Sequence, residues 1–285
     1  GASDSLWSFA IRPLLDPREM GAGADHVARV IAGDAELACR FRQVAGHAPG
    51  QAPPPGRTSV PAEALPAERT LVVAAKALGA FVATLRSGRT AFDRFRDALA
   101  RDDRRAASRY PPAAQRGLRL FVGRGACSTC HSGPMFSNGE FADIGVPFFV
   151  RPGVVDPGRH GGIQRLQASD HHLLSPWSDA PPDAAEVLKT RHVVRQHRNF
   201  GEFKVPSLRN VAVTPPHLHD GSKPDLDAVI RHYSELDLDR LHADGERILK
   251  PLRLDAREVA DLKAFLHTLT DPGAGRWSMP RGPAC

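Results

Sequence analysis

The sequence has 285 residues, of which 41% are hydrophobic and 25% are charged. These fractions are typical of globular proteins and exclude a wholly disordered or fibrous chain, and the length suits two domains or one large one. No run of 18 apolar residues occurs and no leader precedes Gly1, so neither a membrane span nor a signal peptide is expected. Because the chain starts at Gly rather than Met, we expect a processed or truncated product with further sequence upstream.

The net charge of +6 is weak support for a nucleic-acid partner. Lysines and arginines are scattered among acidic residues rather than gathered in one stripe, and aromatic residues make up only 6% of the chain. The interleaved basic and aromatic surface of a single-strand binder is therefore not expected. The same charge suits an acidic protein partner. We predict no binding to nucleic acid.

The hydrophobic pattern predicts a mainly α-helical chain with almost no strands. Apolar residues recur at helical spacing in five segments, which are residues 25–44, 70–85, 112–122, 226–236 and 255–269. Residues 47–66 carry six prolines and are expected to form a solvated loop. Residues 151–204 are rich in Gly, Pro, His and Asp and have little periodicity beyond a short stretch around 184–194. A loop of that length in a compact domain is usually functional or wraps a cofactor.

Two cysteines and a histidine stand together in Cys127-Ser128-Thr129-Cys130-His131, the pattern by which haem c is attached. The two thiols can bond to the haem vinyl groups, and the adjacent imidazole can reach the iron. A zinc site would need a second ligand pair, and no other close cysteine pair exists. A thioredoxin-type redox pair would follow a strand and would need no histidine. Cys39 lies in a helical stretch and is expected to be an inert core thiol.

Further motifs surround this pattern. They are residues 16–21 (DPREMG), 91–95 (AFDRF), 115–136 (QRGLRLFVGRGACSTCHSGPMF), 145–147 (GVP), 203–211 (FKVPSLRNV) and 214–221 (TPPHLHDG). With these motifs the chain resembles the bacterial di-haem cytochrome c peroxidase and MauG family over most of its length, except in the proline-rich loop and part of 151–200. The resemblance implies a mainly α fold with a cytochrome c-like haem domain and long irregular loops that wrap the haem.

The family has two haem motifs, whereas this sequence has one. The resemblance implies that residues 1–108 are the remainder of the first, peroxidatic haem domain, whose own CxxCH lies upstream of Gly1. Residues 109–285 would then form the C-terminal haem domain. A mono-haem descendant is the alternative. Haem c is attached in the periplasm in bacteria of this family, so a periplasmic location is expected.

The resemblance also implies the iron ligands. His131 would be the proximal ligand, and the second ligand of the family lies twelve residues after the glycine of the His-Asp-Gly motif, which is Tyr233 here. A tyrosine ligand stabilises ferric iron and suits storage of oxidising equivalents, whereas Met raises the potential. Tyr233 could instead be a core residue, because it shares a helical face with apolar neighbours. The next ligand candidates would then be His217, His219 and His232.

Three further site residues come from the resemblance. Glu19 matches the carboxylate that acts as general acid and base where peroxide is cleaved over the first haem; a carboxylate at a helix start is the alternative. Thr214 and Pro216 match positions whose backbone carbonyls bind calcium between the haems; a proline-rich turn is the alternative.

Two departures from the family pattern are Phe9, where the family commonly has Gln, and Gly125, where MauG has the tryptophan that passes oxidising equivalents to its protein substrate. Tryptophan tryptophylquinone maturation is therefore not expected. The implied function is an oxidoreductase that uses hydrogen peroxide, with an electron-donor or substrate protein as partner and electrons passing through the His131 haem. The alternatives are a mono-haem electron-transfer protein without peroxidase activity and a CxxC metal-binding module.

Overall fold

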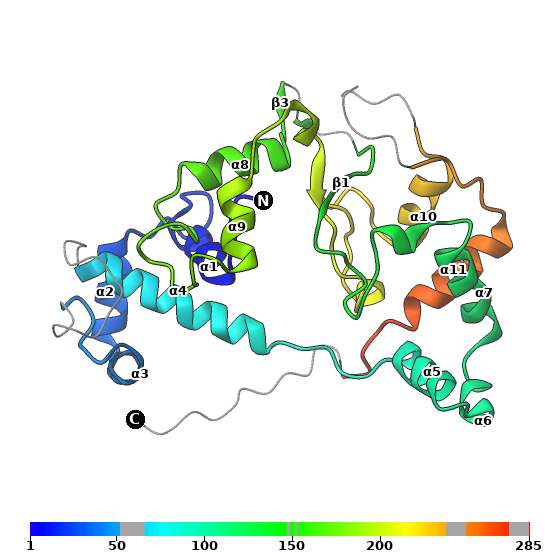
Figure 1. Ribbon diagram of the computed structural model, residues 1–285, viewed down its shortest axis with the longest axis horizontal. Helices are drawn as coiled ribbons and strands as arrows, with labels where there is room; N and C mark the ends of the chain where they lie inside the picture. Colours follow the sequence, from blue (N-terminus) through cyan, green and yellow to red (C-terminus); the bar gives the residue numbers. More distant parts are fainter. Residues whose placement is uncertain (52–65, 147–148, 152, 238–248, 274–284) are drawn as a thin grey trace. The chain divides into compact units, whose positions relative to one another are not determined.

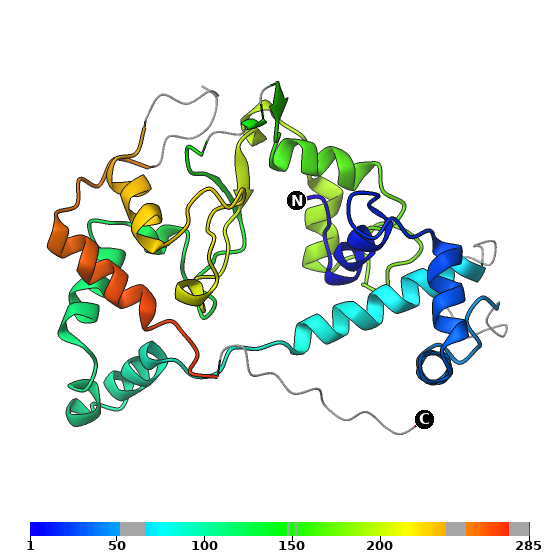
Figure 2. The same cartoon turned by 180° about the vertical axis from the view of Figure 1, so that it is seen from behind.

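The structure, a computed structural model, describes residues 1–51, 66–146, 149–151, 153–237, 249–273 and 285 (Figures 1 and 2). Its α-helices are α1 (Leu6–Leu15), α2 (Ala24–Gly33), α3 (Ala35–Ala45), α4 (Pro66–Thr84), α5 (Ala91–Ala100), α6 (Arg104–Ala107), α7 (Pro112–Val122), α8 (Arg159–Gln167), α9 (Ala185–His192), α10 (Leu226–Ser234) and α11 (Ala256–His267). The strands are β1 (Phe141–Asp143), β2 (Phe149–Arg151), β3 (Val154–Val155) and β4 (Glu202–Lys204). The strands form two antiparallel pairs, β1 with β4 and β2 with β3. The mainly helical fold expected from the sequence is confirmed, and within the described ranges no helix is long and apolar enough to cross a membrane.

The chain divides into two compact units. The first unit contains residues 1–86, 162–195 and 280–285, and the second unit contains residues 87–161 and 196–279. Each unit is therefore assembled from segments that are far apart in the sequence. The sequence analysis assigns residues 1–108 and 109–285 to two haem domains. That assignment is separate from the two compact units and stays a prediction.

The first unit is organised by the crossing of α1 and α4. A Cβ atom added to Gly79 of α4 would stand 3.0 Å from the backbone nitrogen of Trp7, so the glycine permits the close approach of the two helices. The buried side chains around this crossing are Ile11, Leu71, Val72, Ala75 and Trp177. They form the core of the first unit, and Trp177 is the residue that segment 162–195 contributes to it.

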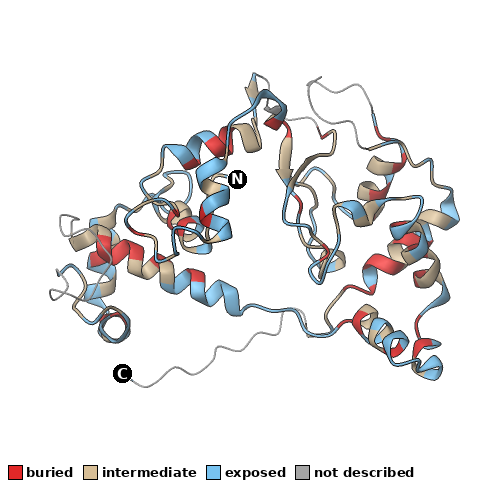
Figure 3. Cartoon of the chain, in the orientation of Figure 1, coloured by how far each residue is buried: buried red, intermediate tan, exposed pale blue. Residues whose placement is uncertain are grey.

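The second unit is organised by the contact between α7 and α11. A Cβ atom added to Gly117 would stand 2.0 Å from the carbonyl oxygen of Asp261. Only glycine therefore allows the two helix backbones to approach each other this closely. Beside it, Arg116 donates two hydrogen bonds to the Asp261 carboxylate, at 2.7 and 2.6 Å. The core around the contact consists of Phe121, Phe136, Leu226, Ile230, Leu262, Phe265, Leu266 and Leu269, and the buried positions of α11 are red in Figure 3.

Three sequence expectations need correction. The single helix expected over 25–44 is two helices, because Asp34 breaks the run and its side chain accepts a hydrogen bond from the Leu37 amide at 2.8 Å, as an N-cap. The segment 151–204 contains α8, whose weak amphipathic pattern hid it. Cys39 is a half-buried residue in a disulfide with Cys285 rather than an inert core thiol. The core of the expected proline-rich loop, residues 52–65, lies outside the described residues.

We expect Gly117→Ala to destabilise the protein by about 1–3 kcal/mol, because the added methyl group would force α7 and α11 apart. This cost exceeds the gain of up to about 1 kcal/mol that alanine normally brings to a helix interior. The matched control is Gly33→Ala in the last turn of α2, where nothing lies within 4 Å of the added atom. Urea unfolding followed by circular dichroism measures both changes. Equal unfolding midpoints for Gly117→Ala and the wild type would contradict the role given to this contact.

Candidate haem site

The CxxCH motif lies in a tight turn directly after α7. The backbone reverses through Gly123 to Ala126, where the Gly125 amide donates to the Leu120 carbonyl at 2.9 Å and Ala126 adopts a positive φ of 50°. A short 3₁₀ helix over Cys127–Thr129 follows, and the His131 amide donates to the Cys127 carbonyl at 2.9 Å. A Cβ atom on Gly125 would stand 2.7 Å from the Leu120 carbonyl oxygen. The turn therefore requires glycine at 125.

Cys127 and Cys130 are both free, partly buried thiols. Burial raises the pKa of Cys127 to about 11 and also raises the pKa of Cys130. Reactive cysteines of thioredoxin-type proteins have lowered pKa values instead, so this pair does not resemble a disulfide-exchange centre. Among the described residues, no group of three or more His, Cys, Asp and Glu side chains could hold a metal ion. Two unpaired thiols with an adjacent imidazole are the donor set that covalent haem attachment uses.

The imidazole of His131 is oriented by backbone carbonyl groups. Its Nδ1 atom donates a hydrogen bond to the Phe136 carbonyl at 2.9 Å, which leaves the lone pair on Nε2. Burial lowers the pKa of His131, and hydrogen bonding to the carbonyls of Phe136 and Pro206 partly offsets this effect. A neutral imidazole held through Nδ1 is the form that binds a metal ion through Nε2. His131 is therefore in the right state and orientation to hold haem iron.

The loop that orients His131 is anchored by residues distant in sequence. Ser137 Oγ donates to the Val205 carbonyl at 2.7 Å, and Ser207 Oγ donates to the Met135 carbonyl at 2.6 Å. Arg209 Nε donates to the Pro134 carbonyl at 2.6 Å, and its two terminal nitrogens bind the carboxylate of Asp93 in α5 at 2.9 and 3.0 Å. These bonds fix the loop from 134 to 137 against the 205–209 segment. Residues of the FKVPSLRNV motif therefore hold the loop that orients the imidazole of the CxxCH motif.

Asp93 also caps the N-terminus of α5 in the same unit. Its carboxylate accepts hydrogen bonds from the amide and the hydroxyl of Thr90, both at 2.9 Å, and so completes the capping box of α5. The Arg209 guanidinium, followed by the Thr90 hydrogen bonds, holds the pKa of Asp93 well below its usual range against the effect of burial. The sequence analysis did not identify Arg209 or Asp93 as site residues. No local signal could have found the pair, because the two residues lie in different segments and meet only in the folded unit.

Tyr233 lies on α10 and is half-buried, so its phenol is partly desolvated. Burial raises the pKa of Tyr233, and the thiols of Cys127 and Cys130 raise it further, so the phenol and both sulfur atoms share one environment. Leu226 and Ile230 on the same helix belong to the core cluster, whereas Tyr233 does not. This separation weakens the interpretation of Tyr233 as one more core residue. The structure thus brings Cys127, Cys130, His131 and Tyr233 together in the second unit.

The three alternative histidines have other contacts. His232 Nε2 donates to the Ile144 carbonyl at 2.8 Å. His217 pairs with Lys223 through backbone hydrogen bonds at 2.7 and 3.3 Å, and these close a turn around Gly221. The ring of His219 stacks on Phe203 with a centroid distance of 3.4 Å. The ring contacts of His232 and His219 favour Tyr233 over these two histidines, whereas the contacts of His217 involve only its backbone.

The other predicted site residues lie on the surface. Glu19 is exposed in the turn between α1 and α2 in the first unit, and its amide donates to the Asp16 carbonyl at 2.9 Å. It is therefore not at the start of a helix. Phe9 is 62% exposed on α1. Thr214 and Pro216 are exposed, and Thr214 Oγ1 donates to the Asn210 carbonyl at 3.2 Å.

Comparison with known proteins gives consistent similarities. A model of the di-haem cytochrome c peroxidase family matches residues 1–101. The methylamine utilization protein MauG of Methylorubrum extorquens is 31% identical over 281 residues, which cover 96% of this chain and 61% of that protein. The cytochrome-c peroxidase IdrP1 of a Pseudomonas species is 32% identical over 160 residues, which cover 55% of this chain and 39% of that protein. The chain thus spans about two fifths to three fifths of the length of these relatives.

Two solved structures have a similar fold. The diheme peroxidase BthA from Burkholderia thailandensis superposes with a TM-score of 0.63 at 21% identity, covering 95% of this chain and 65% of that one. A MauG-like protein associated with microbial copper homeostasis gives a TM-score of 0.61 at 23% identity, covering 96% and 72%. At these identities the likeness concerns the fold, which is mainly helical and cytochrome c-like. In its sequence motifs and its matched relatives, the chain is similar to the di-haem cytochrome c peroxidase and MauG family.

Proposed function

We propose that this chain is the redox part of a peroxidase in which one haem c is attached to Cys127 and Cys130 and bound at iron by His131 and Tyr233. The observation that carries the proposal is the convergence of the two free thiols, the carbonyl-oriented imidazole and the partly desolvated phenol in one unit. The haem, when bound, supplies reversible one-electron redox chemistry. The protein would fix the imidazole through Phe136, hold the phenol in a half-buried position and attach the cofactor by two bonds.

The first test concerns attachment. When the protein matures in a cell with haem c assembly machinery, we expect its mass to increase by one haem that survives denaturation, because thioether bonds do not depend on folding. Cys127→Ala and Cys130→Ala should each leave at most one thioether bond, whereas the matched control Ser128→Ala should keep both. Mass spectrometry of the denatured protein measures this. A wild-type protein without covalent haem would exclude the proposal and would favour a CxxC metal-binding module.

The second test concerns the iron ligand. Tyr233→Met should raise the reduction potential of the haem, because thioether sulfur favours ferrous iron and phenolate oxygen favours ferric iron. Tyr233→Phe should remove the ligand and change the ferric spectrum. A core tyrosine would lose only a hydrogen bond in this variant, worth about 0.5–1.5 kcal/mol, with no spectral change. The control is Tyr110→Phe, because the Tyr110 hydroxyl bonds to Thr268 at 2.7 Å away from the CxxCH motif. Identical spectra and potentials for Tyr233→Phe and the wild type would rule out ligation.

We further propose that hydrogen peroxide is the oxidant and that its cleavage belongs to Glu19 rather than to the His131 side. An iron atom that already has His131 and Tyr233 as ligands has no position left for peroxide. Glu19 is an exposed carboxylate in the first unit, and it lies within residues 1–101, which the family model matches. In that position its carboxylate could accept a proton from one peroxide oxygen and deliver it to the leaving oxygen.

The chain with its single haem motif should therefore be a poor peroxidase, and Glu19→Gln should not change its slow reaction with peroxide. In a longer polypeptide that also carries a haem beside Glu19, the same substitution should lower peroxide turnover by about 10²–10⁴-fold, the range of general acid–base catalysis. The control is Glu36→Gln, an exposed carboxylate of α3. Fast peroxide turnover by the 285-residue chain alone would reverse the roles given to the two sites.

Three expectations accompany this proposal. The reducing equivalents, or the oxidised substrate, would come from a partner protein. The location would be the periplasm, where haem c is attached in bacteria of this family. Calcium bound by the carbonyls of Thr214 and Pro216 would lie in the same unit as the CxxCH motif, and both residues are exposed. If haem is attached but no peroxide reaction occurs in the longer polypeptide, the chain would be an electron-transfer protein instead.

A further inference from the structure

The positive charge of the chain is concentrated in one stretch of the second unit. Residues 87–124 contain ten arginines, four aspartates and no lysine or glutamate. This surplus of six positive charges equals the net charge of +6 of the whole chain, so the remaining residues are neutral in sum. The sequence analysis treated the basic residues as scattered, and that description is wrong for this stretch. The segment forms α5, α6 and α7.

Half of these arginines have an acidic partner. Arg116 and Arg124 pair with Asp261 and Glu258 of α11, and Arg89, Arg96 and Arg104 pair with aspartates of the same stretch. The other five form no ion pair with any residue that the structure describes, and all five are exposed. They are Arg94, Arg101, Arg105, Arg109 and Arg119. Their charge is therefore directed to solvent rather than used to hold the fold.

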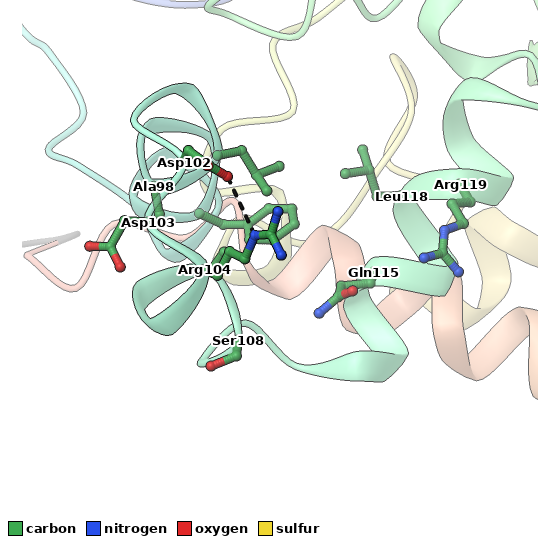
Figure 4. Close-up of a pocket in the computed structure, with 11 residues that line it drawn as sticks. Ala98, Asp102, Asp103, Arg104, Ser108, Gln115, Leu118 and Arg119 are labelled. Atoms are coloured by element: carbon green, nitrogen blue, oxygen red, sulfur yellow. Dashed lines mark ion pairs between the residues drawn. The ribbon is translucent and has the colours of Figure 1, made fainter.

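A hollow of about 580 Å³ lies within this basic surface (Figure 4). Its apolar lining includes Phe95, Leu99 and Leu118, and Leu99 is 57% exposed. Arg104 from α6 and Arg119 from α7 also line it, and a single ion pair of 3.6 Å joins Arg104 to Asp102. Apolar side chains together with arginines are typical of protein–protein contacts.

We propose that the surface formed by α5, α6 and α7 around this hollow is the docking site for the acidic face of a partner protein. Charge complementarity identifies the partner: the exposed arginines of α5–α7 attract carboxylates, and the apolar side chains Phe95, Leu99 and Leu118 offer a contact that a simple polyanion would not use. The proposal deepens the proposed function, because it gives the partner protein a place beside the CxxCH motif.

The position of the hollow suits a redox partner. Leu118 lines the hollow and also packs against the core cluster that Cys127 contacts. The same helix, α7, continues through the Gly123–Ala126 turn into the CxxCH motif. A protein seated on α5–α7 would therefore contact the element that carries the cofactor attachment site.

The test uses the full chain in its ferric state, without peroxide, so that its outcome is independent of any peroxidase activity. The probe is succinylated cytochrome c, in which lysines have become carboxylates, and native basic cytochrome c is the matched probe of opposite charge. We expect calorimetry at about 20 mM ionic strength to detect binding of the succinylated protein only, weakening at least tenfold by about 200 mM as screening increases. Amide hydrogen exchange should be slowed over residues 98–119. Equal binding of both probes would overturn the proposal.

Charge-reversal variants locate the site. Arg104→Glu with Arg119→Glu should weaken binding about tenfold or more, and the milder Arg104→Gln with Arg119→Gln should weaken it less, as a check that folding is retained. The matched control is Arg29→Glu with Arg195→Glu, two exposed arginines of the first unit, which should change affinity less than twofold. Equal losses in both double variants would mean that only net charge matters and would refute the site. Tighter binding of phosphatidylglycerol vesicles to the same segment would assign it to a lipid surface instead, and would equally refute it.

Discussion

The near-contact of the α7 and α11 backbones at Gly117 is the constraint on which the second unit depends. Because no side chain separates the helices there, the Asp261 carboxylate comes within reach of Arg116, and Phe121 and Phe265 meet in the core. The end of α7 is placed by the same contact, and the CxxCH turn begins directly at that end. A small residue in the middle of a helix, which costs helix stability by itself, thus sets the position of the cofactor attachment site.

The second level of organisation is the network around Arg209. This side chain reaches the Pro134 carbonyl and the Asp93 carboxylate at once, and so joins the loop below His131 to the start of α5. Breaking this ion pair is costly, because without Arg209 the buried Asp93 carboxylate keeps only the longer contact to Arg96, at 3.8 Å. The orientation of the imidazole therefore depends on residues from three separate stretches of the chain. The arginine-rich surface of α5–α7 is built on the same helices.

The sequence predicts most helices and the CxxCH residues. The features that it did not predict have physical reasons. The helix over 112–122 has clear periodicity and begins and ends as predicted, and Cys127, Cys130 and His131 are recognisable because their chemistry requires adjacency. The break at Asp34 was missed because apolar spacing continues across it while the capping side chain interrupts the backbone. Helix α8 was missed because its residues lack an apolar face. Arg209 and Asp93 were missed because an ion pair between distant segments leaves no local pattern.

The division of the chain into alternating segments has a consequence for the order in which the protein is made. The CxxCH motif belongs to a unit whose other half begins only at residue 196, after the chain has passed through the first unit. During synthesis from the N-terminus, α7 lacks its partner α11 until residues 256–267 have been made. Throughout that interval the turn with the two thiols is not yet enclosed by α10 and α11. The topology thus delays the enclosure of both sulfur atoms until the segment that carries α10 and α11 has been made.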